Sequence, residues 1–118
     1  MSAGWLPTPE SLSPAPGEVL VLLASLEVSP ARLAALRATF SPREQARADS
    51  FAHEHLKSHW SAARGMLREI LGRATGTEPA EIAFTYAAHG KPALRQDPGR
   101  APLWFNVSNS GERVVYAL

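Results

Sequence analysis

The sequence predicts an α+β fold, with about three helices packed on a small, mainly antiparallel sheet. Apolar residues recur at spacings of three and four from Leu56 to Ala74, as expected for one face of a long helix. Further along the chain, short segments alternate between apolar and polar residues, which is typical of half-buried strands. The chain has 118 residues, 45% hydrophobic and 19% charged, which fits a single globular domain.

The N-terminal residues are predicted to lie outside this domain. Residues 1–17 contain four prolines, which neither continue a helix nor donate to a β-ladder, so we expect a Pro-rich arm. The folded unit is then expected at 18–118. Its first strand is predicted in the apolar run Val19–Val28, and because both faces of this run are apolar we expect a central strand.

Helix starts are signalled by serine followed by proline, which occurs twice. Ser29-Pro30 predicts a short first helix, and Ser41-Pro42 predicts a second. Glu44 lies three residues after Ser41 and completes a capping box. The third and longest helix is predicted from His53 to Ala74, with Gly76 as its terminator.

The C-terminal part of the chain is predicted to form short strands separated by polar turns. A turn is expected at His89–Pro92 and polar loops at Gln96–Pro102 and Ser108–Gly111. The strands are expected at Ile82–Tyr86, Ala93-Leu94, Phe105–Val107 and Val114–Tyr116.

Composition excludes several classes of protein. The chain has no cysteine, which rules out disulfide scaffolds, cysteine zinc sites and thiol nucleophiles. The net charge of +1 and the lack of an aromatic-basic platform argue against nucleic-acid binding. The apolar run Val19–Leu26 is too short to span a bilayer and follows no basic region, so we expect a cytoplasmic protein without membrane contact.

Polar clusters indicate an anionic ligand such as a phosphate. Arg43 and Arg47 lie one turn apart on the predicted second helix, and guanidinium groups bind phosphate through two hydrogen bonds. In the turn His89-Gly90-Lys91, glycine permits a close backbone approach and lysine adds a charge. The loop Ser108–Gly111 offers hydroxyls and amides, but no G-x-S-x-G pattern of a hydrolase. A solvated helix face and ordinary hairpin turns are the alternatives.

Two histidines on the long helix raise the question of a metal site. His55 and His59 are four residues apart and share a helix face. The zincin pattern needs glutamate directly after its first histidine, where Leu56 stands, and no third ligand is evident nearby. We therefore predict no metal ligands, and a solvated helix face or a single ligand-contacting histidine instead.

The order of these motifs resembles the N-terminal half of a Sfp-type 4′-phosphopantetheinyl transferase. It runs S-P-x-E-x-x-R, then W-S-A-A-R-G-M-L-R on the long helix, then H-G-K-P, then F-N-V-S-N-S-G. The resemblance covers roughly Val19 to Leu118. It implies a transferase-like half domain that takes part in moving phosphopantetheine from coenzyme A to a serine of an acyl or peptidyl carrier protein, with Mg²⁺.

The resemblance also implies roles for individual residues, all of them in binding coenzyme A. Arg47 binds a coenzyme A phosphate from the second helix, and the turn His89-Gly90-Lys91 lines the nucleotide, with Lys91 near a phosphate. The segment from Asn106 through Ser108 to Asn109 forms the other wall. His59 stands where the family usually has a phosphate-binding arginine, and Asn109 where it usually has a histidine.

The catalytic residues of the family have no counterpart in this chain. The family holds Mg²⁺ with acidic residues of a G-x-D-x-E strand and a W-x-x-K-E helix in its second half, and neither motif is present. We therefore expect no catalysis without a second half, which would be a separate chain, a segment cut away or a homodimer mate. The final strand, Arg113–Leu118, is expected to be exposed until that partner covers it. The alternative is a non-catalytic coenzyme A-binding or assembly module derived from the family.

Overall fold

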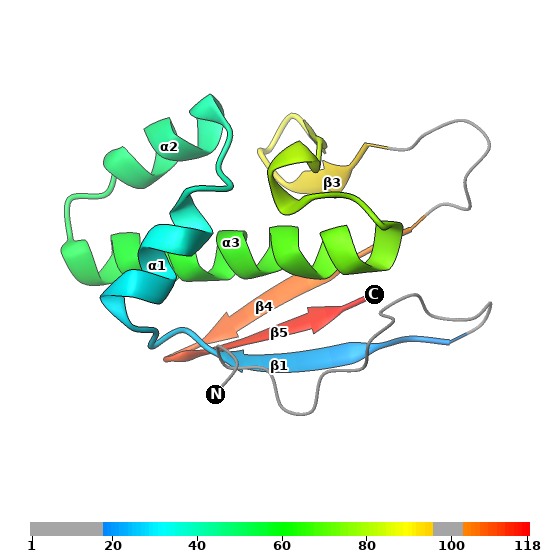
Figure 1. Cartoon of the computed structure of the whole chain (residues 1–118), viewed down its shortest axis with the longest axis horizontal. Coiled ribbons are helices and arrows are strands. Elements are labelled where there is room, and N and C mark those ends of the chain that lie inside the picture. The colour runs from blue at the N-terminus through cyan, green and yellow to red at the C-terminus, as the bar shows by residue number, and fades with distance from the viewer. Residues whose placement is uncertain (1–17, 96–102) are drawn as a thin grey trace.

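The fold is built around a 22-residue helix, α3 (Glu54–Thr75), as the computed structural model in Figure 1 shows. The structure describes residues 18–95 and 103–118. A β-sheet lies on one side of α3, helix α2 and a small hairpin lie on the other, and α1 crosses it. The predicted α+β class, with three helices and antiparallel sheets, is confirmed.

Local capping signals set the starts of the first two helices. Helix α1 (Pro30–Arg37) begins after Ser29, whose hydroxyl accepts a hydrogen bond from the backbone N–H of Arg32 at 3.1 Å. Helix α2 (Pro42–Asp49) begins after Ser41, and Glu44 completes the predicted capping box with it. Both predicted starts are therefore confirmed.

Helix α3 buries one long face and ends where the sequence predicts. Gly76 adopts the left-handed conformation, with φ of +71°, and closes the helix. A Cβ atom added at Gly65 would lie 2.5 Å from the Cβ atom of Leu36, so glycine allows α1 to approach closely. The buried α3 side chains that form the core are Ala62, Ala63, Met66, Leu67, Ile70 and Leu71.

The main sheet has three antiparallel strands in the order β1-β5-β4, namely β1 (Val21–Ser25), β5 (Arg113–Ala117) and β4 (Asn106–Ser110). Its inner face packs on α3 through Ala24, Val114 and Tyr116. The Tyr116 hydroxyl donates to the carbonyl of Ala63 at 2.5 Å. Burial raises the pKa of the Tyr116 phenol, which keeps it a neutral donor inside the core.

Two predictions about this sheet were wrong, and for the same reason. The first strand is an edge strand, and Val21 and Leu23 on its outer face are 64% and 49% exposed. The last strand, β5, is the central one, with a neighbour on each side and buried Val114 and Tyr116. Strand order depends on pairing between distant segments, which apolar content alone does not reveal.

A second, two-stranded sheet lies on the other side of α3. A 3-10 turn, η1 (Pro79–Glu81), leads into β2 (Phe84–Tyr86), which pairs antiparallel with β3 (Pro92–Leu94). Two strands are thus found where the sequence predicts them, although the first begins at Phe84 rather than Ile82. The turn between them spans residues 87–91, because Pro92 already belongs to β3. The predicted arm (1–17) and loop (Gln96–Pro102) lie outside the described residues. No helix in the described part of the chain is long and apolar enough to cross a membrane.

Candidate functional site

A buried ion-pair network fixes the position of α2 against α3. The carboxylate of Glu44 is 1% exposed and accepts from Arg68 Nε at 2.7 Å and from Arg64 Nη1 at 3.1 Å. The same carboxylate accepts from the backbone N–H of Ser41 at 2.9 Å. Since a buried carboxylate is stable as an ion only when it is paired and hydrogen-bonded, this network orients α2 rigidly.

The network also holds the small hairpin. Arg68 Nη1 donates to the carbonyls of Pro79 and Ile82 at 2.8 and 2.9 Å, and Arg64 Nη1 donates to the Tyr86 hydroxyl at 3.2 Å. Glu44 of S-P-x-E and the two arginines of W-S-A-A-R-G-M-L-R therefore form one structural frame. The sequence did not reveal that these two motifs pair with each other.

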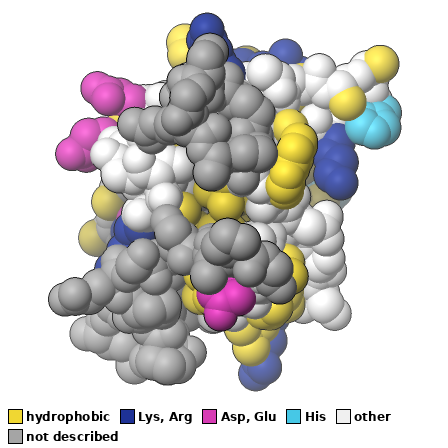
Figure 2. All heavy atoms as spheres, turned by 90° about the vertical axis from the view of Figure 1, so that its right-hand side faces the viewer, with side chains coloured by type: hydrophobic (Ala, Val, Ile, Leu, Met, Phe, Trp, Pro, Cys, Tyr) yellow, Lys and Arg dark blue, Asp and Glu magenta, His cyan; other side chains and the backbone are white. Residues whose placement is uncertain are grey.

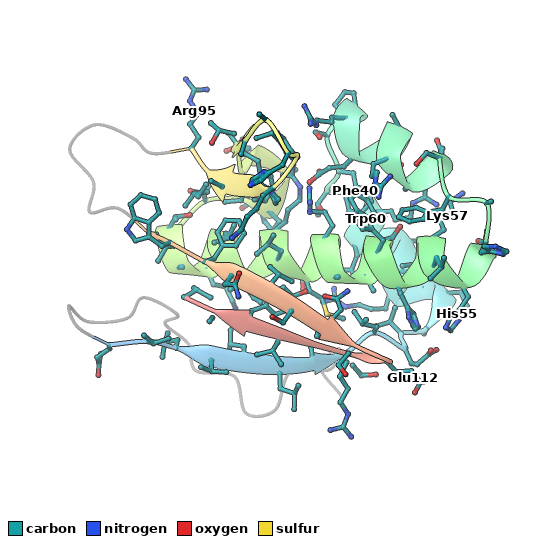
Figure 3. The ribbon with its side chains drawn as sticks, turned by 180° about the vertical axis from the view of Figure 1, so that it is seen from behind. Phe40, His55, Lys57, Trp60, Arg95 and Glu112 are labelled. Atoms are coloured by element: carbon teal, nitrogen blue, oxygen red, sulfur yellow. The ribbon has the colours of Figure 1, made fainter. Side chains whose placement is uncertain are left out.

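Two arginines on α2 stack on aromatic rings at the surface of this frame. The guanidinium of Arg43 lies 3.7 Å from the ring centroid of Tyr86, and that of Arg47 lies 4.7 Å from the ring centroid of Phe51. Phe51 in turn packs on Trp60 of α3, with ring centroids 6.0 Å apart. Figure 3 shows Trp60 between α3 and α2. Both arginines are exposed, so stacking restrains the guanidinium planes while their N–H groups stay accessible.

The turn between β2 and β3 presents His89, Gly90 and Lys91 to solvent. Gly90 has φ of +88°, which favours glycine, and its N–H donates to the Ala87 carbonyl at 2.8 Å. A groove of about 420 Å³ runs from this turn to the segment before β4. Figure 2 shows hydrophobic side chains beside basic ones on this side of the molecule. The groove is lined by Lys91 together with Tyr86, Leu94, Leu103, Trp104 and Phe105.

The predicted polar loop at Ser108–Gly111 was wrong. Strand β4 continues to Ser110, and only Gly111 and Glu112 form the turn to β5, with Gly111 at φ of +59°. Pairing with β5 has overridden the low strand propensity of serine and asparagine. Successive side chains on a strand point to opposite faces, so Asn106 and Ser108 lie on the outer face of the sheet.

Asn109 lies on the other face, at the end of the sheet closest to the start of α3. It pairs with Val114, a buried residue of the inner face, and Val114 pairs with Ala24 of β1. Asn106, Ser108 and Asn109 therefore do not point in one direction. All three are exposed.

His59 has a partner that the sequence did not predict. Its Nε2 atom lies 2.8 Å from Oε1 of Glu27, a residue that follows β1 and is 32 positions away in the chain. The ring of His55 lies 4.1 Å from that of His59, centroid to centroid. Only a signal for long-range pairing could have found Glu27, because no local pattern links it to the helix.

The predicted binding residues thus occupy separate surface positions rather than one enclosed pocket. Arg47 lies on α2, His59 near the start of α3, Lys91 in the hairpin turn and Asn109 near the end of β4. Among the described residues, the hairpin turn with Lys91 shares a groove with the segment just before β4. The strand register places Asn109 at the same end of the sheet as Glu27.

Comparison with known proteins identifies the family. The model of the family described as 4′-phosphopantetheinyl transferase, N-terminal, matches residues 26–118. The chain belongs to this family. The resemblance inferred from the order of the motifs is therefore confirmed, and the fold described above is that of an N-terminal domain of a 4′-phosphopantetheinyl transferase.

Two curated relatives agree with this assignment. The chain is 38% identical over 114 residues to the 4′-phosphopantetheinyl transferase HetI from Nostoc sp., an alignment that covers 97% of the chain and 48% of that protein. It is 36% identical over 75 residues to the putative 4′-phosphopantetheinyl transferase slr0495 from Synechocystis sp., covering 64% of the chain and 30% of that protein. The chain therefore spans about half the length of HetI and a smaller part of the second relative.

Proposed function

We propose that the chain is one half of a 4′-phosphopantetheinyl transferase and contributes contacts to coenzyme A. The whole enzyme would move phosphopantetheine from coenzyme A to a serine of an acyl or peptidyl carrier protein. The family match over residues 26–118 and the partial coverage of HetI support this proposal.

The observation that carries the proposal is a set of exposed cations on a rigid frame. Arg47 is exposed and stacked on Phe51, on a helix that the buried Glu44 carboxylate ties to α3. Lys91 is exposed in a hairpin that the same network holds through Arg64. Coenzyme A carries several phosphate charges, and preorganised cations bind such a polyanion with little loss of side-chain entropy.

The remaining predicted contacts are proposed to complete the binding surface from other elements. His89 and Gly90 would line the nucleotide beside Lys91. His59 and Asn109 would approach from the opposite side of α3, with Asn106 and Ser108 on the outer face of the sheet. This division between faces suggests that a second half completes the coenzyme A cleft.

The described residues do not supply a suitable site for Mg²⁺. Their only candidate group of three metal-binding side chains is Glu27, His55 and His59. Two imidazole nitrogens do not fit Mg²⁺, which prefers octahedral oxygen ligands. We therefore assign the Mg²⁺ ligands of the reaction to the proposed second half.

The outer face of the main sheet is the proposed contact surface for that second half. Val19, Val21 and Leu23 are 69%, 64% and 49% exposed on or next to β1. The outer face of β5 adds the half-buried Val115 and Ala117. A second half that packs on this face would remove the apolar patch from water.

Calorimetric titration of coenzyme A into the purified chain tests the binding role. We expect Arg47→Ala and Lys91→Ala each to weaken binding about tenfold or more, because each removes a charge-assisted contact. Arg73→Ala is the matched control, since Arg73 is an exposed arginine in the last turn of α3 and is not among the predicted contacts. Equal affinities of all three variants would contradict the assignment of Arg47 and Lys91.

A transfer assay separates the half-enzyme from the alternative, a non-catalytic coenzyme A-binding or assembly module. The chain is combined with a candidate second half, Mg²⁺, coenzyme A and a carrier protein, and the mass of the carrier protein is measured. An increase that needs both halves supports the half-enzyme. Coenzyme A binding without transfer in any combination supports the non-catalytic module, and sedimentation then shows whether two copies assemble.

A further inference from the structure

Three side chains from two distant segments meet beside the start of α3. His55 and His59 are one turn apart on the helix, and Glu27 follows β1. One potential ligand atom from each side chain lies within 4.8 Å of those of the other two. His59 Nε2 lies 2.8 Å from Glu27 Oε1.

The donor atoms of this cluster suit zinc. Zn²⁺ is bound by imidazole nitrogen and carboxylate oxygen at about 2.0–2.2 Å, so ligand atoms in a tetrahedral site lie about 3.4 Å apart. The 2.8 Å between His59 and Glu27 and the upper limit of 4.8 Å for all pairs lie on either side of that value. A set of three protein ligands leaves the fourth position to water or another small ligand.

The exposure of the three side chains allows the small adjustment that binding requires. His59 is the anchor, with a side chain only 13% exposed. Glu27 has a side chain 53% exposed, and His55 is exposed as well, so both are able to change rotamer toward a shared ion. Helix position fixes the two histidines on one face, which reduces the entropy lost on binding.

We propose that Glu27, His55 and His59 form a zinc site with one open coordination position. The positive end of the α3 dipole disfavours a cation here. Negative charge offsets it, from Glu27 itself, from Glu54 in the first helical turn and from Glu112, whose backbone carbonyl accepts from the N–H of Leu26 at 2.7 Å. Figure 3 shows His55 and Glu112 at the same end of the molecule.

The proposed zinc site shares His59 with the proposed coenzyme A contacts, but it does not depend on the transferase activity. With zinc bound, a phosphate oxygen would reach the open metal position instead of the imidazole. The test therefore uses zinc alone, so that its failure and the failure of coenzyme A binding are separate outcomes.

Calorimetric titration of Zn²⁺ into the chain without a histidine tag tests the proposal. We expect one equivalent to bind, and His55→Ala, His59→Ala and Glu27→Gln each to weaken binding at least tenfold. His53→Ala is the matched control, because His53 precedes the same helix but does not belong to the cluster. Circular dichroism confirms that the variants fold.

Substitution by Co²⁺ distinguishes direct coordination from loose surface binding. A cobalt ion in the proposed site is expected to give the visible absorption of tetrahedral cobalt, which His55→Ala abolishes and His53→Ala preserves. The proposal is overturned if zinc does not bind, or if binding is equally strong in the wild type, His55→Ala and Glu27→Gln.

Discussion

Two clusters along α3 each join one carboxylate to two basic side chains, but they lie in opposite environments. In the first, Glu44 pairs with Arg64 and Arg68 inside the molecule, and the carboxylate and Arg68 are 1% and 2% exposed. In the second, Glu27 contacts His59, with His55 beside it, at the surface. Each cluster combines one carboxylate from outside the helix with two basic side chains of the helix one turn apart.

The difference shows that burial and side-chain chemistry together decide whether a cluster stabilises the fold or is available to bind a ligand. Arginine has no lone pair for a metal and stays protonated, so the buried cluster is permanently ionic and holds α2 and β2 in place. A histidine ring nitrogen is able to bind a metal ion, so the exposed cluster is able to exchange a hydrogen bond for a metal bond. The first cluster therefore orders the fold, and the second remains available to a ligand.

The largest effect is expected from Glu44→Gln. This change leaves Arg64 and Arg68 without their counter-charge, and loss of one partner from a buried ion pair costs about 3–5 kcal/mol. Urea denaturation followed by circular dichroism measures the free energy of unfolding. Destabilisation of less than about 1 kcal/mol would show that the two arginines find other partners and that the network is not the frame of the fold.

A much smaller effect is expected from Glu27→Gln in the absence of metal. The Glu27 side chain is 53% exposed, and a solvent-exposed ion pair contributes about 1 kcal/mol at most. The same urea titration, at equal salt concentration, gives the comparison with Glu44→Gln. If Glu27→Gln lowered the free energy of unfolding as much as Glu44→Gln, the Glu27 cluster would be structural as well, and the two clusters would not differ in role.

Features that depend on residues close together in the chain could be predicted from the sequence, whereas features that depend on distant residues could not. Ser41 and Glu44 are three residues apart, and their capping box was predicted and found. Strand order was not, because β5 becomes central only through pairing with β1, which is distant in the chain. At the site, Glu27, the third ligand of the proposed zinc site, could not be predicted for the same reason. The spacing of His55 and His59 on one helix face could be.

The smallest effect is expected from Ser61→Ala, which tests whether the buried Ser61 hydroxyl lacks a hydrogen-bond partner. Ser61 is fully buried in α3, and its hydroxyl oxygen has no hydrogen-bond partner among the described residues. Burying an unpaired hydroxyl is unfavourable, and alanine has a higher helix propensity than serine. We therefore expect a gain of up to about 1 kcal/mol in the free energy of unfolding. If Ser61→Ala instead destabilises the chain by more than that, the hydroxyl has a partner, and this buried polar group of α3 would be hydrogen-bonded, as Arg68 of the same helix is.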